Sequence, residues 1–155
     1  MFVCLLPCVA FARLGDTPQQ LSDRLGAGTD ITDKYAAPPN TKIYKYTRNG
    51  IGTLSFFWYG KCCQECYMNV DRTAFSDAEI QGFLTANSLG GTWTEDFSLS
   101  ERGWKSGVTV DANGENVPIL GATYDGHIFM CFTVKFAQAY GAALAKAGKN
   151  RIKDF

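Results

Sequence analysis

Three cysteines in the middle of the chain are the first residues whose spacing suggests chemistry. Cys62, Cys63 and Cys66 include a Cys-x-x-Cys pair. Such a pair can act as a redox dithiol when one thiol lies at a helix N-terminus, where its pKa is lowered. Here the neighbouring residues favour a strand, which would place Cys63 and Cys66 on opposite faces, and Glu65 would raise the pKa of a nearby thiol. An enzyme using Cys63 and Cys66 is therefore an alternative hypothesis rather than the first one.

The same cysteines bear on metals, haem and crosslinks. A structural zinc site needs four ligands, and one cysteine pair with the single histidine, His127, does not supply a standard set. Tyr67 stands where haem attachment requires a histidine. We therefore predict neither a metal nor a cofactor. In an oxidising compartment Cys131 is expected to pair with Cys62 or Cys66, and each disulfide would contribute about 2–4 kcal/mol. Free thiols packed in the core are the alternative.

Other catalytic combinations find little support. A hydrolase triad would need a base beside a nucleophile, but His127 begins a strand and no G-x-S-x-G motif is present. Paired carboxylates occur at Glu95 and Asp96, and again near Asp111 and Glu115. Both pairs fall at turns or loops, where solvated acids are the usual reading. An enzyme using surface carboxylates is thus another alternative.

Three tryptophans offer a candidate ligand surface. Trp58, Trp93 and Trp104 could line a groove for a sugar or a peptide, although indoles more often pack in a core or on a sheet face. The chain carries 15 Lys and Arg against 15 Asp and Glu. Because the net charge is zero, nothing favours a nucleic-acid partner. The predicted partner is an envelope protein or a small ligand of unknown identity.

The first twelve residues have the character of an export signal. Residues 2–12 form an uncharged apolar run, which is too short to span a bilayer but suits the core of a signal peptide. Cleavage after Ala12 would leave one domain over residues 13–155. A second interpretation makes Cys8 a lipidated cysteine, which would anchor the protein to a membrane. Either reading predicts an extracytoplasmic location, periplasmic or secreted.

Caps and turn signals divide the remaining chain into alternating helices and strands. Thr17 to Gln20 and Ser76 to Glu79 are capping boxes that begin two helices, and Asn49-Gly50 is a tight hairpin turn. A third helix is expected over residues 134–147. The predicted strands cover residues 42–48, 51–59, 62–70, 91–96, 103–110, 117–124 and 127–133, whereas residues 27–41 are expected to be a loop.

This order predicts an α+β fold. Strand runs joined by tight turns give an antiparallel sheet built from meanders, in the order helix, three strands, helix, four strands, helix. We expect the helices to pack on one face of this sheet. On the third strand the period of two would place Cys62, Cys66, Met68 and Val70 together on the core face.

Several of these segments resemble a known family. Residues 14–20, 24–26, 43–61 and 76–80, together with Trp93, resemble a family of uncharacterised small exported bacterial proteins. More distantly, the capped helix before a strand meander is similar to small outer-membrane assembly lipoproteins and to the β-lactamase-inhibitor-like fold, although the Pro usual in both groups does not follow Gly26. The resemblance implies export and a shared fold, and it transfers no functional residue.

The first hypothesis is therefore an exported, non-enzymatic binding or protein-interaction module. An enzyme of unknown type and a lipid-anchored envelope structural protein are the alternatives. Because a binding module needs a place for its partner, the first hypothesis predicts an apolar patch or a groove on the folded domain.

Overall fold

The computed structural model describes residues 13–96, 101–106 and 120–148. The predicted leader with Cys8, and the acids Asp111 and Glu115, lie outside these residues. The helices are α1 (Pro18–Leu25), α2 (Asp77–Ala86), α3 (Val134–Lys146) and the short 3-10 helix η1 (Thr32–Lys34). The strands are β1 (Thr29–Asp30), β2 (Thr41–Arg48), β3 (Ile51–Trp58), β4 (Lys61–Asn69), β5 (Trp93–Glu95), β6 (Arg102–Ser106), β7 (Leu120–Tyr124) and β8 (Ile128–Thr133).

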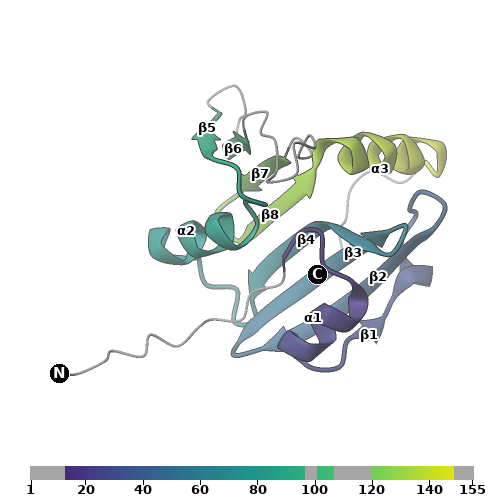
Figure 1. The fold of residues 1–155 in the computed structure, drawn as a ribbon, viewed down its shortest axis with the longest axis horizontal. Coiled ribbons are helices and arrows are strands. Elements are labelled where there is room, and N and C mark those ends of the chain that lie inside the picture. The colour runs from purple at the N-terminus through teal and green to yellow at the C-terminus, as the bar shows by residue number, and fades with distance from the viewer. Residues whose placement is uncertain (1–12, 97–100, 107–119, 149–155) are drawn as a thin grey trace.

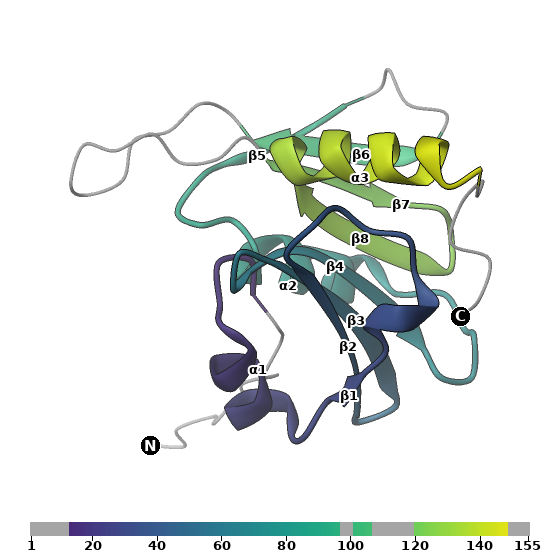
Figure 2. The same cartoon turned by 90° about the vertical axis from the view of Figure 1, so that its right-hand side faces the viewer.

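All eight strands form one antiparallel sheet, seen from two sides in Figures 1 and 2. Its order is β1-β2-β3-β4-β8-β7-β6-β5, so each meander keeps its sequence order and the two meet where β4 pairs with β8. The predicted α+β class is confirmed, and the order of elements roughly matches the prediction. The expected loop at residues 27–41 instead contains β1 and η1.

Local signals explain where the elements begin and end. Thr17 and Ser76 each accept a hydrogen bond from the backbone three residues later, and each is capped in return by Gln20 or Glu79. Asn49 and Gly50 both have positive φ, 51° and 78°, as a type I′ hairpin turn requires. Caps and turns of this kind depend on a few neighbouring residues, so the sequence alone could predict them.

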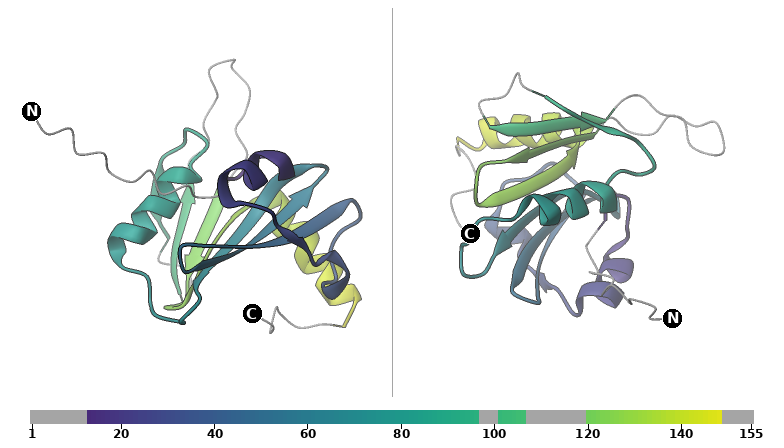
Figure 3. Two further views of the ribbon diagram at one scale, coloured as in Figure 1. Left: turned by 90° about the horizontal axis from the view of Figure 1, so that it is seen from below. Right: turned by 90° about the vertical axis from the view of Figure 1, so that its left-hand side faces the viewer.

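Helices cover both faces of the sheet (Figure 3). α1 and α2 pack on one side, the α1/α2 face, through Leu21, Ile80 and Phe83. α3 packs on the other side, the α3 face, through Phe136 and Tyr140. The expectation that all helices share one face is therefore wrong. The central strands are buried on both sides, as in residues 62–67 of β4, and each face of such strands needs its own cover.

A β-bulge at Cys63 changes which side chains share a face. Phe57 pairs with Cys62 and Phe56 pairs with Gln64, so Cys63 has no partner on β3. The extra residue shifts the alternation by one. Cys63 and Cys66 consequently lie on the same face, the α3 face, whereas Cys62 lies on the α1/α2 face. Both predictions about the cysteines' faces are wrong.

The fourth residue of the predicted core face also lies elsewhere. Val70 follows the end of β4 and is 58% exposed. The expected core face therefore keeps Cys66 and Met68 and loses Cys62 and Val70.

Candidate functional site

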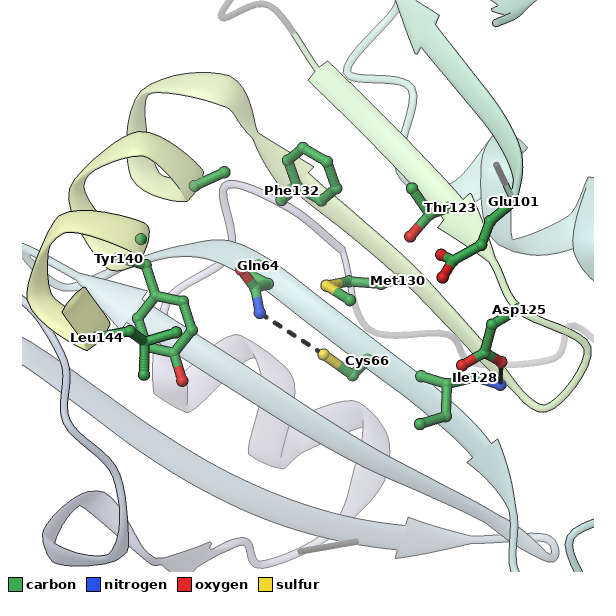
Figure 4. Close-up of a pocket in the computed structure, with 12 residues that line it drawn as sticks. Gln64, Cys66, Glu101, Thr123, Asp125, Ile128, Met130, Phe132, Tyr140 and Leu144 are labelled. Atoms are coloured by element: carbon green, nitrogen blue, oxygen red, sulfur yellow. Dashed lines mark hydrogen bonds between the residues drawn. The ribbon is translucent and has the colours of Figure 1, made fainter. Parts of the chain in front are cut away.

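A hollow of about 370 Å³ lies on the α3 face, between α3 and the strands β4, β7 and β8 (Figure 4). Its walls are mostly apolar, and polar groups stand along one side. The apolar lining comes from Cys66, Ile128, Met130, Phe132, Tyr140 and Leu144, the polar groups along that side are Glu101, Thr123 and Asp125, and Gln64 lies on the floor beside Cys66. Small-molecule sites commonly have this size and this mixture.

Strand pairing places the floor of this hollow. Cys66 on β4 lies directly opposite Met130 on β8, and Met130 in turn lies opposite Thr123 on β7. Paired residues in antiparallel strands point to the same side, so these three side chains form one row across the sheet. α3 supplies the facing wall, because Tyr140 and Leu144 are one helical turn apart.

Phe132 shapes the end of the hollow beside β7. Its partner across the strands is Gly121, and a Cβ atom at Gly121 would come within 2.5 Å of the Phe132 ring. The ring therefore lies across the backbone of β7. A glycine at this position gives Phe132 the space that its present orientation requires.

Gly141 lies on α3 at the mouth of the hollow, where its backbone is exposed. Glycine inside a helix costs up to about 1 kcal/mol relative to alanine. No atom lies within 4 Å of the position that its Cβ would take, so packing does not demand a glycine. What the missing side chain does provide is open space at the mouth.

A second hollow, of about 430 Å³, lies further along the same face. Leu54 and Met68 line its floor, and the basic residues Lys34, Lys45 and Arg72 stand around it. Met68 is the direct strand partner of Ile128, which lines the first hollow. The two hollows therefore adjoin where β4 pairs with β8.

The α1/α2 face holds a buried polar network. Glu65 on β4 is fully buried and accepts hydrogen bonds from Ser55 (3.1 Å), Cys62 (3.3 Å) and the Tyr67 hydroxyl. Burial raises the pKa of Glu65 to about 7, even though these hydrogen bonds and the nearby Arg24 favour the charged form. A carboxyl group that titrates near neutrality thus lies inside the core.

Asn87 connects this network to the segment before α1. Its amide nitrogen donates to the Tyr67 hydroxyl at 3.1 Å, and its oxygen accepts from the backbone of Leu14 at 2.8 Å. The hydrogen bonds that join Glu65 and Asn87 to this network were not predicted from the sequence. The sequence does hold one signal for Glu65: a glutamate within a strand whose other residues are expected to be buried must find partners inside the core.

The predicted cysteines do not form a reactive pair. Burial raises the pKa of Cys63 and of Cys66 to about 12, and burial together with Glu65 raises that of Cys62. Thiolate, the nucleophilic form, is therefore scarce at neutral pH at all three positions. The expected effect of Glu65 on a neighbouring thiol is confirmed at Cys62 and Cys66.

The expected disulfides are not formed in this structure. Cys62, Cys63, Cys66 and Cys131 are all buried free thiols. Cys66 and Cys131 belong to opposite faces of the sheet, whereas Cys62 and Cys131 share the α1/α2 face. A bridge between Cys62 and Cys131 in an oxidising compartment stays a prediction.

The three tryptophans do not form one surface. Trp104 is 3% exposed in the core of the α1/α2 face, and Trp93 packs beside that core with its ring nitrogen donating to Leu84. Trp58 lies on the other face and donates to the carbonyl of Pro39. Their separation shows that the ligand-surface hypothesis needs residues other than these.

The remaining candidates have structural partners on the surface. Glu95 lies 3.7 Å from Arg102, and Asp96 lies 2.8 Å from Lys105. A ring nitrogen of His127 lies 3.2 Å from the carbonyl of Arg72, in an exposed turn. Among the described residues, no group of three or more His, Cys, Asp or Glu is placed to hold a metal ion.

Comparisons with known proteins add little to this geometry. No family model and no curated protein matches the sequence. Among solved structures, the chain is similar to a cysteine-rich secretory protein from Staphylococcus aureus subsp. aureus Mu50, with a TM-score of 0.42 and 12% identity over 82% of this chain and 48% of that one. The chain thus spans about half the length of that protein. Within the part of the chain that the structure describes, no helix has the length and apolar character to cross a membrane.

Proposed function

We propose that this chain is a non-enzymatic binding module, and that the hollow beneath α3 receives the apolar part of its ligand. The observation that carries the proposal is a space of about 370 Å³ on the α3 face, with half-buried Ile128, Met130 and Phe132 along its floor. A ligand that covers these side chains would remove apolar surface from water, which favours binding by about 25 cal/mol per Å². The polar groups along one side would orient that ligand.

The arrangement of α3 supports this use of the hollow. A side chain at Gly141 would narrow the mouth of the hollow. The helix has a glycine there although glycine lowers helix stability relative to alanine. The alternative of an enzyme using Cys63 or Cys66 gains no support, because both thiols are buried and protonated at neutral pH. Binding is therefore the function that the geometry favours.

The test fills the hollow without disturbing the core. Gly141→Leu adds a side chain at the mouth, and Ala142→Leu adds a similar volume at the next, exposed position of α3. We expect the neutral fluorophore N-phenylnaphthylamine to bind the wild-type protein and Ala142→Leu with enhanced emission, and to bind Gly141→Leu at least about tenfold more weakly. Far-ultraviolet circular dichroism should show the same fold for all three proteins.

Equal dye binding by the two leucine variants would show that the dye binds elsewhere, and the proposal would fail. So would the absence of any saturable binding by the wild-type protein. A loss of binding in both variants with a retained fold would place the site outside this hollow and count against the proposal in the same way.

We also propose that the domain works outside the cytoplasm, as a periplasmic or secreted protein. The support is the apolar run at residues 2–12. The intact mass of the protein from its native host checks this: a chain beginning at Arg13 is expected, a lipid-bearing chain beginning at Cys8 would favour the membrane-anchored alternative, and an unprocessed chain would contradict export.

A further inference from the structure

The second hollow differs from the first in charge. Lys34, Lys45 and Arg72 stand around a floor made by Leu54 and Met68. Lys34 comes from η1, Lys45 from β2 and Arg72 from the turn after β4, so three separate segments bring a positive charge to this place. Cations gathered beside apolar surface suit a ligand that has an anionic end and an apolar body.

Strand register joins this basic end to the first hollow. Lys45 pairs with Leu54, Leu54 with Cys66, Cys66 with Met130, and Met130 with Thr123. The row crosses five strands, and with neighbouring strands about 4.8 Å apart it is about 19 Å long. All five residues line one hollow or the other, with a cation at the β2 end of the row, but Leu54 and Cys66 in its middle are buried and lie beneath the surface that a ligand would touch.

A neighbouring row provides the passage between the hollows. This row crosses β3, β4 and β8: Met68 pairs with Gly52 on one side and with Ile128 on the other. All three residues are half-buried. Gly52 has no side chain to stand above the sheet, and Met68 is flexible enough to adapt to a bound chain. A ligand can therefore lie over this row while it contacts both hollows.

We infer that the ligand is a single-chain amphiphilic anion, of the fatty-acid type, whose carboxylate lies among Lys34, Lys45 and Arg72 and whose chain runs over Met68 and Ile128 into the hollow beneath α3. The inference rests on the proposed function and adds the chemical class of the ligand and its direction of binding. The charge pattern supports this direction, since the basic groups lie at one end and the apolar hollow lies at the other.

The acidic groups of the first hollow favour this direction over the reverse. Asp125 already accepts hydrogen bonds from the backbones of His127 at 2.9 Å and Ile128 at 2.7 Å, so its carboxylate serves the turn before β8. Glu101 is the other acidic residue that lines this hollow. A cationic head group beside Glu101 is the competing arrangement, and the test must separate the two.

The test compares two amphiphiles that share a tail and differ in the sign of the head group. Decanoate and decyltrimethylammonium are titrated into the full-length protein below their micellar concentrations, with binding followed by calorimetry. We expect decanoate to bind at least about tenfold more tightly, and its affinity to fall as salt is added. Lys45→Gln and Lys34→Gln should each weaken decanoate by about threefold, as expected for exposed charges.

Lys42→Gln is the matched control. Lys42 lies on the same strand as Lys45 but points to the opposite face, where it lies 3.4 Å from Asp30. The substitution removes the same charge as Lys45→Gln. It should leave decanoate affinity unchanged. An equal loss in Lys42→Gln and Lys45→Gln would mean that net charge alone acts, and would overturn the inference.

The remaining outcomes separate this inference from the proposed function. If N-phenylnaphthylamine binding is blocked by Gly141→Leu but decanoate binds no better than decyltrimethylammonium, the binding module stands and the anionic ligand is wrong. Preference for decyltrimethylammonium would mean that the ligand carries a cationic head group, and would also overturn the inference. Binding only to vesicles of phosphatidylglycerol, with no binding of free decanoate, would assign the basic end to a membrane surface and reject the single-chain ligand.

Discussion

The two faces of β4 use the same strand for opposite purposes. Toward α1 and α2, Cys62, Glu65 and Tyr67 are completely enclosed, and aromatic rings fill the space around them. Toward α3, Cys66 is equally buried in a smaller core, but half-buried Met68 lies where two hollows adjoin on that face. One face is a closed core with a polar network inside it, and the other is a partly covered sheet with room for another molecule.

The difference follows from how many elements cover each face. Two helices and the segment around Leu14 close the α1/α2 face, where Leu14 is 2% exposed and donates to Asn87. Among the described residues, the α3 face has one long helix, α3, and the short helix η1 lies at its far side. A sheet of eight strands is too wide for one helix, so the uncovered strip between α3 and η1 is what the two hollows occupy.

Removing one aromatic ring from each face should show the largest difference in stability between the two faces. Phe83 is fully buried and stacks on Tyr67 at a centroid distance of 4.4 Å, whereas Phe132 is half-buried beside the first hollow. We expect Phe83→Ala to lower the free energy of unfolding by about 3–5 kcal/mol, and Phe132→Ala to lower it by less than about 2 kcal/mol. Urea unfolding with unchanged slopes measures both values. Equal losses would show that the α3 face is packed as tightly as the other.

The polar network should give the closed face a pH dependence. The pKa of Glu65 is raised to about 7 in the folded protein, from about 4.3 in an unfolded chain. The folded state therefore holds this proton more tightly, and the resulting stability is complete below about pH 4.3 and is lost as the pH rises through 7. The loss across this window is up to about 3 kcal/mol.

Glu65→Gln removes this titration while it keeps the size of the side chain. The difference in unfolding free energy between wild type and Glu65→Gln should change by up to about 3 kcal/mol between about pH 4 and pH 8, with wild type losing stability as the pH rises. Glu95→Gln, at an exposed position, serves as the control and should run parallel to wild type. Parallel curves for wild type and Glu65→Gln would show that this carboxyl does not titrate inside the core.

Sequence patterns predicted the elements well because their ends depend on neighbouring residues. The capping box at Ser76, the turn at Asn49-Gly50 and the glycine after Leu25 each mark a boundary within a few positions. The bulge at Cys63 was not predictable in this way. It depends on how β3 and β4 align over their whole length, and it reversed the expected faces of two cysteines.

The candidate site was beyond the reach of local patterns for the same reason. The first hollow forms where α3 lies over the sheet, and its lining comes from segments far apart in the chain. The tryptophans were candidates because indole rings can line a groove, but burial of Trp104 depends on the side to which α2 packs. Glu65 was considered only for its effect on thiols, although its need for buried partners was also predictable, since a charged residue within a buried strand always needs partners.

Two glycines on the α3 face give the finest test of the comparison. A Cβ at Gly121 would approach the Phe132 ring to 2.5 Å, whereas a Cβ at Gly52 would meet only the Met68 carbonyl at 3.6 Å, an ordinary contact. Gly121→Ala should therefore cost about 1 kcal/mol, because the half-buried ring must swing away from β7. Gly52→Ala should be neutral or stabilising by up to about 1 kcal/mol, since alanine restricts the unfolded chain.

Their effects on the hollow should differ in the same direction. Phe132 lines the hollow beneath α3, so its displacement in Gly121→Ala changes the site, whereas Gly52→Ala leaves the first hollow as it is. N-phenylnaphthylamine affinity should change by about threefold or more in Gly121→Ala and stay constant in Gly52→Ala. If both variants unfold and bind the dye as wild type does, the Phe132 ring moves freely, and the α3 face is more open than its packing indicates.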